Sequence, residues 1–410
     1  MLASSPAFRA EPVQVDVILS VLGSNARALA LPPRGRGSDA NGRNDQLCRH
    51  AARGAADDVG SAVVFKRTAR SLPMLGRTNN HLSTGMENGQ TMSTSTQPAV
   101  LLDPGPPAPE PGWQSSVFNC VLRLFPQKKR LASAATLQER VHRLALRPAS
   151  CEPPDLGRDV KVTLQKRAGW PVYQTAASKR HDGNATVVFL HGGGHFQEIA
   201  RAHWRFVGYL TRHAAARCVV PIFPLVPRAT ANDLVPAMGD LLRGLLEEVR
   251  PSKVTLVGNS SGAGLGLAAA QWLRDHGLPQ PKALVLISPW LDVSVSRKEQ
   301  ATLAALDPLQ DVPGLVEAGR LYAGDLDVTH PFVSPLNGDL RGLAPITVFT
   351  GTLDLLHPDS IELAKKAALQ GVPLDLHARN GLPHNYPLLP TPEGREARAM
   401  IARALAREPQ

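Results

Sequence analysis

Ser260 stands in the pattern G-x-S-x-G, which residues 258–262 fill as Gly-Asn-Ser-Ser-Gly. The pattern follows the apolar run 254–257 and opens a stretch of small residues, so it falls between an expected strand and an expected helix. Such a sharp turn holds the serine in a strained conformation, and Gly258 and Gly262 remove the Cβ atoms that would clash there. The context predicts a nucleophile at Ser260 rather than a structural glycine turn.

A second glycine-rich stretch, residues 191–195, reads His-Gly-Gly-Gly-His and follows the apolar run 186–190. Consecutive glycines at a strand end let backbone N–H groups approach a substrate closely, which is what an oxyanion hole requires. We expect the N–H groups of Gly193, Gly194 and Ser261 to be its donors.

No metal site or cofactor is expected. His191 and His195 are four residues apart, but the glycines between them, beginning at Gly192, do not favour a helix that would put both rings on one face. We therefore assign His191 and Gly192 a supporting role in the glycine motif. The four cysteines lie far apart and form no C-x-x-C pair, which argues against a zinc site and a disulfide scaffold.

A serine nucleophile needs a general base and an acid that orients the base. Three histidines lie near the C-terminus. His377 falls inside an expected strand and His357 at a helix start, where structural roles are favoured. His384 lies in the loop 381–387 beyond the last expected strand, from which its ring can reach across the strand ends. We expect His384 to be the base.

Two aspartates could serve as the acid. Asp292 follows the expected strand 283–287 and Asp354 follows the expected strand 346–350. Both positions are geometrically usable, and Asp354 is preferred because it lies in a strand-to-helix loop. With either acid the chain order is Ser, Asp, His.

The elements that must position these residues alternate along the chain. Eight short runs rich in β-branched residues are expected strands: 160–166, 171–175, 186–190, 218–223, 254–257, 283–287, 346–350 and 374–377. Helix-compatible stretches follow from the third run onward: 197–215, 231–249, 261–276, 311–323, 358–370 and 393–407. This alternation predicts an α/β fold with an eight-stranded, mostly parallel sheet and helices on both faces. In such sheets the chemistry lies at the carboxyl ends of the strands.

The net charge of +10 is concentrated in one segment of the 410-residue chain. Residues 115–180 hold 13 basic and 4 acidic residues, whereas residues 181–410 hold 21 and 22. The segment is poor in aromatic residues and matches no nucleic-acid module, so we expect no nucleic-acid partner. Its basic side chains are interpreted as a solvated helix face. The alternative is weak contact of residues 115–147 with an anionic membrane surface.

Taken in order, five motifs within about residues 115–410 resemble the hormone-sensitive-lipase-like branch of the α/β-hydrolases, a family of carboxylesterases. They are His191-Gly-Gly-Gly, Gly-Asn-Ser260-Ser-Gly, Ser288-Pro-Trp-Leu-Asp292, Asp354-x-Leu-x-x-Asp359 and Gly381-x-x-His384. The resemblance implies carboxylic ester hydrolysis, Asp354 as the triad acid, an N-terminal helical cap over the site and no cofactor.

The chain also departs from the family pattern. Asn259 and Ser261 stand where the family usually has Asp and Ala, His195 stands where an aromatic residue is common, and Tyr386 replaces Phe. These changes bear on substrate preference more than on reaction class.

With the cap included, the chain divides into three expected parts. Residues 1–112 lack helical or strand periodicity and end in a proline-rich linker, so we expect a disordered or non-native extension. Residues 113–155 are expected to be the cap helices and residues 156–410 the catalytic domain. No signal peptide or membrane-spanning run is seen, which favours a cytoplasmic protein.

The leading functional hypothesis is a serine esterase that cleaves short- to medium-chain carboxylic esters or lactones. An amide-type acyl hydrolase, such as a deacetylase or deformylase, would use the same residues. A ligand-binding receptor of this fold would have no need of His384, whose presence favours an enzyme.

Overall fold

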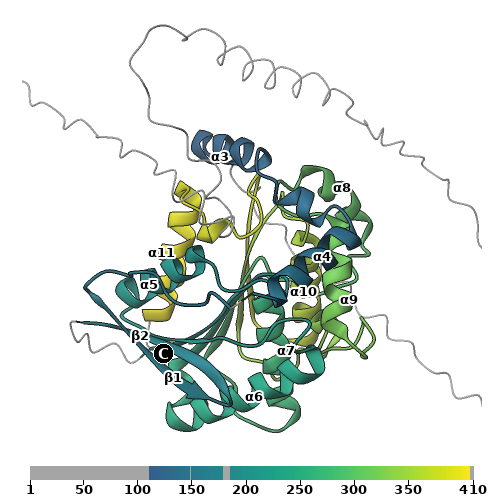
Figure 1. Ribbon diagram of the computed structural model, residues 1–410. Coiled ribbons are helices and arrows are strands. Elements are labelled where there is room, and N and C mark those ends of the chain that lie inside the picture. The colour runs from purple at the N-terminus through teal and green to yellow at the C-terminus, as the bar shows by residue number, and fades with distance from the viewer. Residues whose placement is uncertain (1–109, 148, 179–184, 407–410) are drawn as a thin grey trace, which may run out of the picture. The chain divides into compact units, whose positions relative to one another are not determined.

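The computed structural model describes residues 110–147, 149–178 and 185–406, so the expected extension lies almost entirely outside the described residues. All eight expected strands are present, in one sheet ordered β1-β2-β4-β3-β5-β6-β7-β8 (Figure 1). Their bounds are β1 Val160–Arg167, β2 Trp170–Ala177, β3 Thr186–Leu190, β4 Arg217–Pro221, β5 Val254–Asn259, β6 Ala283–Ile287, β7 Ile346–Gly351 and β8 Leu374–Arg379. β1, β2 and β4 pair antiparallel and the other neighbours pair parallel, which confirms the mostly parallel sheet.

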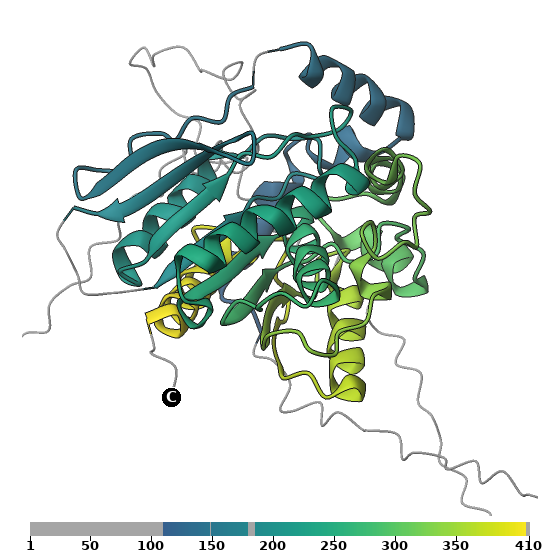
Figure 2. The same ribbon diagram turned by 90° about the horizontal axis from the view of Figure 1, so that it is seen from below.

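Helices cover both faces of the sheet, as Figure 2 shows. Alternate side chains of the buried strand β3 enter two separate cores: Val187 and Phe189 pack in the cluster with α5 and α11, and Val188 and Leu190 in the cluster with α6, α7, α9 and α10. Burial on both faces explains why this strand reads as a continuous apolar run. The helices are α5 Arg201–His213, α6 Ala231–Glu248, α7 Ser261–Asp275, α9 Val312–Ala323, α10 His357–Gln370 and α11 Pro392–Ala406.

The apolar periodicity of the sequence does not predict one of the helices. α8 spans Lys298–Leu306, between β6 and α9, and only Gln300 of its nine residues is buried. A helix with no apolar stripe leaves no 3.6-residue signal in the sequence.

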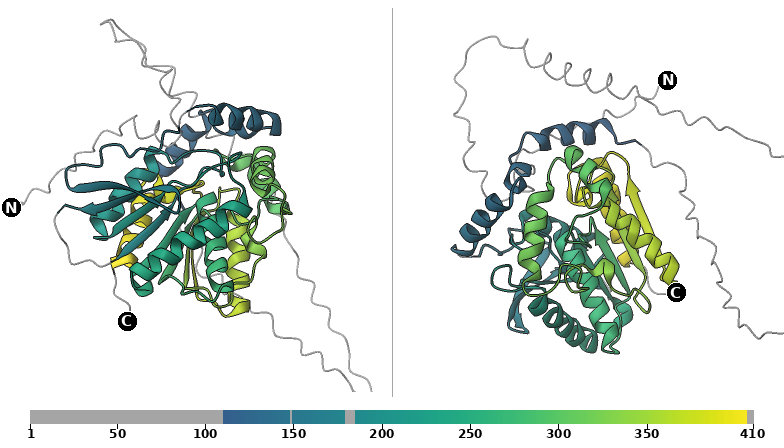
Figure 3. Two further views of the ribbon diagram at one scale, coloured as in Figure 1. Left: turned by 60° about the horizontal axis from the view of Figure 1, so that its bottom comes forward. Right: turned by 90° about the vertical axis from the view of Figure 1, so that its right-hand side faces the viewer.

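The N-terminal part of the described chain is helical, as expected. It comprises α3 Trp113–Arg123, a short 3₁₀ turn η2 Lys128–Leu131 and α4 Ala134–Ala145. Figures 1 and 3 show α3 and α4 (blue) against the outer helices of the α/β body, where α3 contacts α11 and α4 contacts α9. None of the described helices is both long and apolar enough to cross a bilayer.

The basic side chains of this segment are not simply a solvated face, which corrects our interpretation. Arg140 donates to Gln197 Oε1 (2.6 Å) and lies over the Phe196 ring, and Arg147 pairs with Glu198 (2.8 Å). Burial, helped by neighbouring arginines, lowers the pKa of Arg140 to about 10. These guanidinium groups therefore hold α4 and the residues just after it against the loop that follows β3.

Removal of the N-terminal helices gives a first test of the expected domain boundaries. Phe118, Leu122, Leu131, Leu137 and Val141 are buried, and each buried side chain of this size contributes about 1.5–3 kcal/mol. A chain that begins near residue 148 is therefore expected to melt at least about 10 °C lower and to discriminate less among acyl chains.

A chain that begins at Met92 is the matched control. It keeps every contact of the described helices, so we expect the kcat/KM and melting temperature of the full chain. A large loss in this control would place upstream residues in the fold. Unchanged stability and selectivity in the shorter chain would contradict the assignment of these helices as a cap.

Candidate active site

Ser260 occupies a strained turn between β5 and α7. Its backbone adopts φ 53° and ψ −125°, a conformation that non-glycine residues rarely adopt. A Cβ atom at Gly258 would lie 2.6 Å from the Gly262 carbonyl oxygen, and one at Gly262 would collide with the carbonyl oxygens of Leu190 and His191. Glycine is required at Gly258 because the first turn of α7 folds back on it, and at Gly262 because α7 begins directly against the end of β3. The strained turn places the Ser260 hydroxyl at the carboxyl end of β5, where the residue is 7% exposed.

The structure brings Ser260, His384 and Asp354 together from three strand ends. His384, in the loop after β8, lies with Nε2 3.0 Å from Ser260 Oγ and Nδ1 2.9 Å from Asp354 Oδ2. Asp354 follows β7, and its Oδ1 accepts a hydrogen bond from the Leu356 N–H (2.9 Å). These contacts form a continuous hydrogen-bonded row from Ser260 through His384 to Asp354.

The alternative residues lie in other environments. Asp292 Oδ1 accepts from the N–H and hydroxyl of Ser294, at 3.0 and 2.6 Å. His377 pairs with Asp375 (3.0 Å), and His357 Nδ1 lies 3.2 Å from Thr350 Oγ1. Each of these side chains therefore has its own local partner.

Burial and the partner's charge shift the pKa of His384 in opposite directions, and the same is true of the pKa of Asp354. Burial favours the uncharged form of His384, but the charge of Asp354, their hydrogen bond and the charge of Asp307 outweigh it and raise the pKa of His384. Burial would raise the pKa of Asp354, but the charge and hydrogen bond of His384 bring it below its ordinary value. The pair therefore favours an ionised carboxylate that can stabilise an imidazolium.

The glycine loop after β3 lies directly beside the turn that holds Ser260. Gly193 and Gly194 adopt φ of 136° and 63°, which keeps their N–H groups out of strand pairing. The Gly192 N–H donates to Asn259 Oδ1 (2.9 Å), so the amide that replaces the usual Asp anchors this loop. His195 N–H lies 3.3 Å from Ser261 Oγ, so the unusual Ser261 hydroxyl accepts from the same loop.

The two histidines of the glycine motif have different neighbours. The His191 ring stacks on Phe223 with a centroid distance of 4.6 Å, and Nδ1 lies 2.8 Å from its neighbour's carbonyl oxygen, Gly192 O. The His195 ring stacks on Tyr322 at 3.5 Å. Burial lowers the pKa of His191 to about 4 and that of His195 to about 3, so both rings are neutral near pH 7.

Two polar residues that no sequence pattern indicates lie beside the hydrogen-bonded row of Ser260, His384 and Asp354. Asp307, directly after α8, is fully buried, and Gln310 is 6% exposed. Neither belongs to a motif or to an apolar stripe, so only the contacts of the folded chain reveal them.

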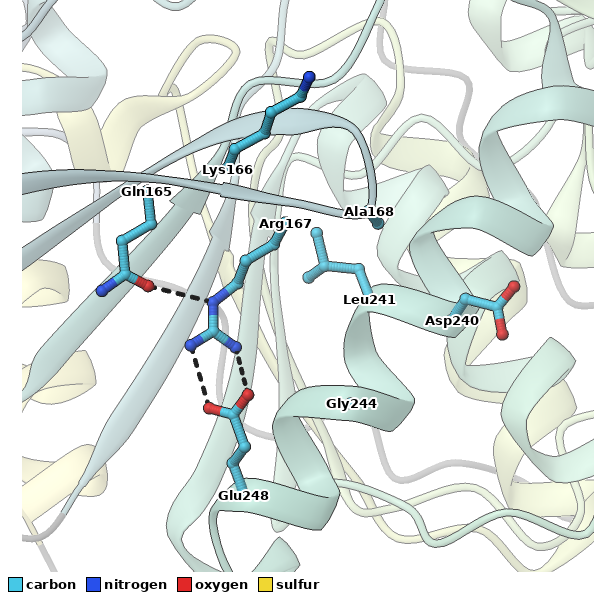
Figure 4. Close-up of a pocket in the computed structure, with 8 residues that line it drawn as sticks. All are labelled: Gln165, Lys166, Arg167, Ala168, Asp240, Leu241, Gly244 and Glu248. Carbon is cyan, nitrogen blue, oxygen red and sulfur yellow. Dashed lines mark hydrogen bonds and ion pairs between the residues drawn. The ribbon is translucent and has the colours of Figure 1, made fainter.

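Two hollows lie away from Ser260. One of about 240 Å³ lies behind the glycine loop and is lined in part by His191, Phe196 and Trp170. The other, of about 440 Å³, lies between the β1–β2 hairpin and α6, where Arg167 pairs with Glu248 at 2.6 and 3.0 Å (Figure 4). The hairpin hollow contains none of the predicted site residues.

The chain is similar to many known proteins. Residues 187–388 match the family described as alpha/beta hydrolase fold. A triacylglycerol lipase of Mycobacterium tuberculosis is 35% identical over 240 residues, 58% of this chain and 49% of that protein. An acetyl-hydrolase of Streptomyces hygroscopicus is 34% identical over 223 residues, 53% of this chain and 74% of that protein. This chain thus spans about half the length of the lipase and three quarters of the acetyl-hydrolase.

The fold has counterparts among solved structures. An esterase from the bacterial hormone-sensitive lipase family superposes with a TM-score of 0.60 at 27% identity. The match covers 72% of this chain and 98% of that esterase.

Proposed function

The chain belongs to the α/β-hydrolase family, in its hormone-sensitive-lipase-like branch of carboxylic ester hydrolases, and we propose that it is a serine carboxylesterase acting through Ser260, His384 and Asp354. The observation that carries the proposal is the hydrogen-bonded row from Ser260 Oγ through His384 to Asp354, at 3.0 and 2.9 Å.

Acylation begins when Ser260 Oγ attacks the ester carbonyl carbon and its proton passes to His384 Nε2. The carbonyl oxygen becomes an oxyanion, which accepts from the N–H groups of Gly193, Gly194 and Ser261. Asp354 keeps Nδ1–H of His384 directed toward itself and stabilises the imidazolium. The tetrahedral intermediate then expels the alcohol, which takes the proton from His384 Nε2 and leaves an acyl group on Ser260.

Deacylation repeats these steps with water. His384 Nε2 accepts a proton from a water molecule whose oxygen attacks the acyl carbon, and the same N–H donors hold the second oxyanion. Collapse of this intermediate releases the carboxylic acid, and Ser260 Oγ recovers its proton from His384.

Short- to medium-chain esters are the proposed substrates. The acetyl-hydrolase relative supports a small acyl group, and its match spans more of the relative's length than the lipase match does. The cap helices support the same size limit, because α3 is anchored beside the base: its Asn119 Nδ2 donates to the Gly381 carbonyl (2.8 Å), three residues before His384.

A chain-length profile tests this proposal. On p-nitrophenyl esters from acetate to palmitate, we expect kcat/KM to be highest for the short and medium chains and lowest for palmitate. A maximum at palmitate would contradict the size limit. Faster cleavage of p-nitroacetanilide than of p-nitrophenyl acetate would favour the amide-type hydrolase.

A further inference from the structure

Asp307 is a buried carboxylate that ties the α8–α9 segment to the loop of the triad acid. Its Oδ1 accepts from the N–H groups of Leu309 (2.7 Å) and Gln310 (3.0 Å). Its Oδ2 accepts from the N–H of Leu355 (2.8 Å), the residue directly after Asp354. The carboxylate is thus held rigidly by three backbone donors while it lies beside a second carboxylate.

Gln310 connects the two carboxylates to the base. With its amide oriented so that the nitrogen faces the two acids, that nitrogen lies 3.3 Å from Asp354 Oδ1 and 3.3 Å from Asp307 Oδ2. In the same orientation its oxygen lies 3.2 Å from His384 Nε2. One side chain therefore contacts both acids and the atom of His384 that exchanges protons with Ser260.

Within the part of the chain that the structure describes, no lysine or arginine side chain is seen to bond the Asp307 carboxylate. Lys128, from η2, donates to the backbone carbonyl of Asp307 (3.0 Å) and not to its carboxylate. The ionisable groups that act on the Asp307 carboxylate are Asp354 and His384. Burial and the charge of Asp354 raise the pKa of Asp307 to about 6, so it is mostly ionised above that pH. A buried anion beside another anion is costly unless a cation forms nearby.

We infer that Asp307 and Gln310 form an auxiliary acidic arm that stabilises protonated His384 during the reaction, as positioning residues supplied by the segment between α8 and α9. This inference rests on the proposed function of Ser260, His384 and Asp354.

The physical basis is the difference between the two states of His384. In the resting enzyme Nε2 carries a lone pair, which does not bind the Gln310 oxygen. Once Nε2 takes the Ser260 proton, its N–H can donate to that oxygen. The imidazolium is then bonded to Asp354 directly and linked to Asp307 through Gln310. The arm thus favours the imidazolium that accompanies the oxyanion over the neutral resting state.

Two variants test the arm by its effect on the pH profile. In Asp307→Asn the neighbouring negative charge is lost, and in Gln310→Met the acceptor at Nε2 is lost with side-chain size retained. We expect each variant to lower kcat about tenfold with little change in KM. The acid limb is the rise of kcat/KM with pH as His384 loses its proton. We also expect the midpoint of this acid limb to shift to a pH about one unit lower, since one pKa unit corresponds to tenfold in equilibrium. Asp311→Asn, whose carboxylate caps α9 by accepting from the Val312 N–H (2.9 Å), is the matched control and should keep the wild-type profile.

The outcomes separate this inference from the proposed function. If Ser260→Ala is inactive but both arm variants fold with wild-type kcat and acid limb, the arm is wrong and the esterase assignment stands. A lower kcat with an unmoved acid limb in Gln310→Met, the variant that keeps the buried carboxylate, would show a merely structural role and also overturn the arm. Retained activity in Ser260→Ala would instead overturn the proposed function itself.

Discussion

Replacing Ser260 with alanine is expected to abolish ester hydrolysis while the fold persists. The substitution removes only the hydroxyl group, whose oxygen lies 3.0 Å from His384 Nε2. Loss of a serine nucleophile from such a triad lowers kcat on the order of 10⁴-fold or more, because water must then attack the ester without an acyl-enzyme. The measurement is kcat on p-nitrophenyl butyrate, together with the melting temperature.

Ser178→Ala is the matched control for this variant. The Ser178 hydroxyl donates to the Arg158 carbonyl (3.1 Å) at the far end of β2, away from the row of site residues. We expect wild-type kcat in this control and wild-type melting temperature in both variants. More than a tenth of wild-type activity in a pure preparation of Ser260→Ala would show that Ser260 is not the nucleophile.

Asp354→Asn is expected to lower kcat about 10⁴-fold, whereas Asp292→Asn changes it by less than about tenfold. The Asp354 carboxylate accepts Nδ1–H of His384 at 2.9 Å, and a carboxamide can donate there and stabilise the wrong tautomer of the ring. The Asp292 carboxylate instead accepts from Ser294, so its loss changes only a local turn. A greater loss from Asp292→Asn would require a different acid in the triad.

The pH profile of wild-type kcat/KM is the reference against which the profile of Asp354→Asn is compared. Only neutral His384 accepts the Ser260 proton, so kcat/KM should rise with pH through the pKa of His384. Because Asp354 and Asp307 raise that pKa, we expect the midpoint of the rise above the ordinary value of about 6.5. In Asp354→Asn the midpoint should fall, since a neutral amide no longer favours the imidazolium.

From the sequence alone the sheet could be predicted, together with Ser260, His384 and a preference for Asp354 over Asp292. Buried parallel strands such as β3 read as apolar runs, and their alternation with helices places His384 and Asp354 at the same strand ends as Ser260. These features are local in the chain: a strand, a turn and a helix start each need particular residue types within a few positions. Local requirements leave local patterns, which is why the strands and Ser260 could be predicted.

The tertiary structure alone decided the features that depend on distant partners. The guanidinium of Arg140 contacts Gln197 and Phe196, where the sequence suggested a solvated side chain. Asp307 reaches the residue after Asp354 because α8, a helix with one buried residue, returns the chain to the loop after β7. A buried charge on an irregular segment has no periodicity, and its neighbours come from elements far along the chain. Its role therefore follows only from folded contacts.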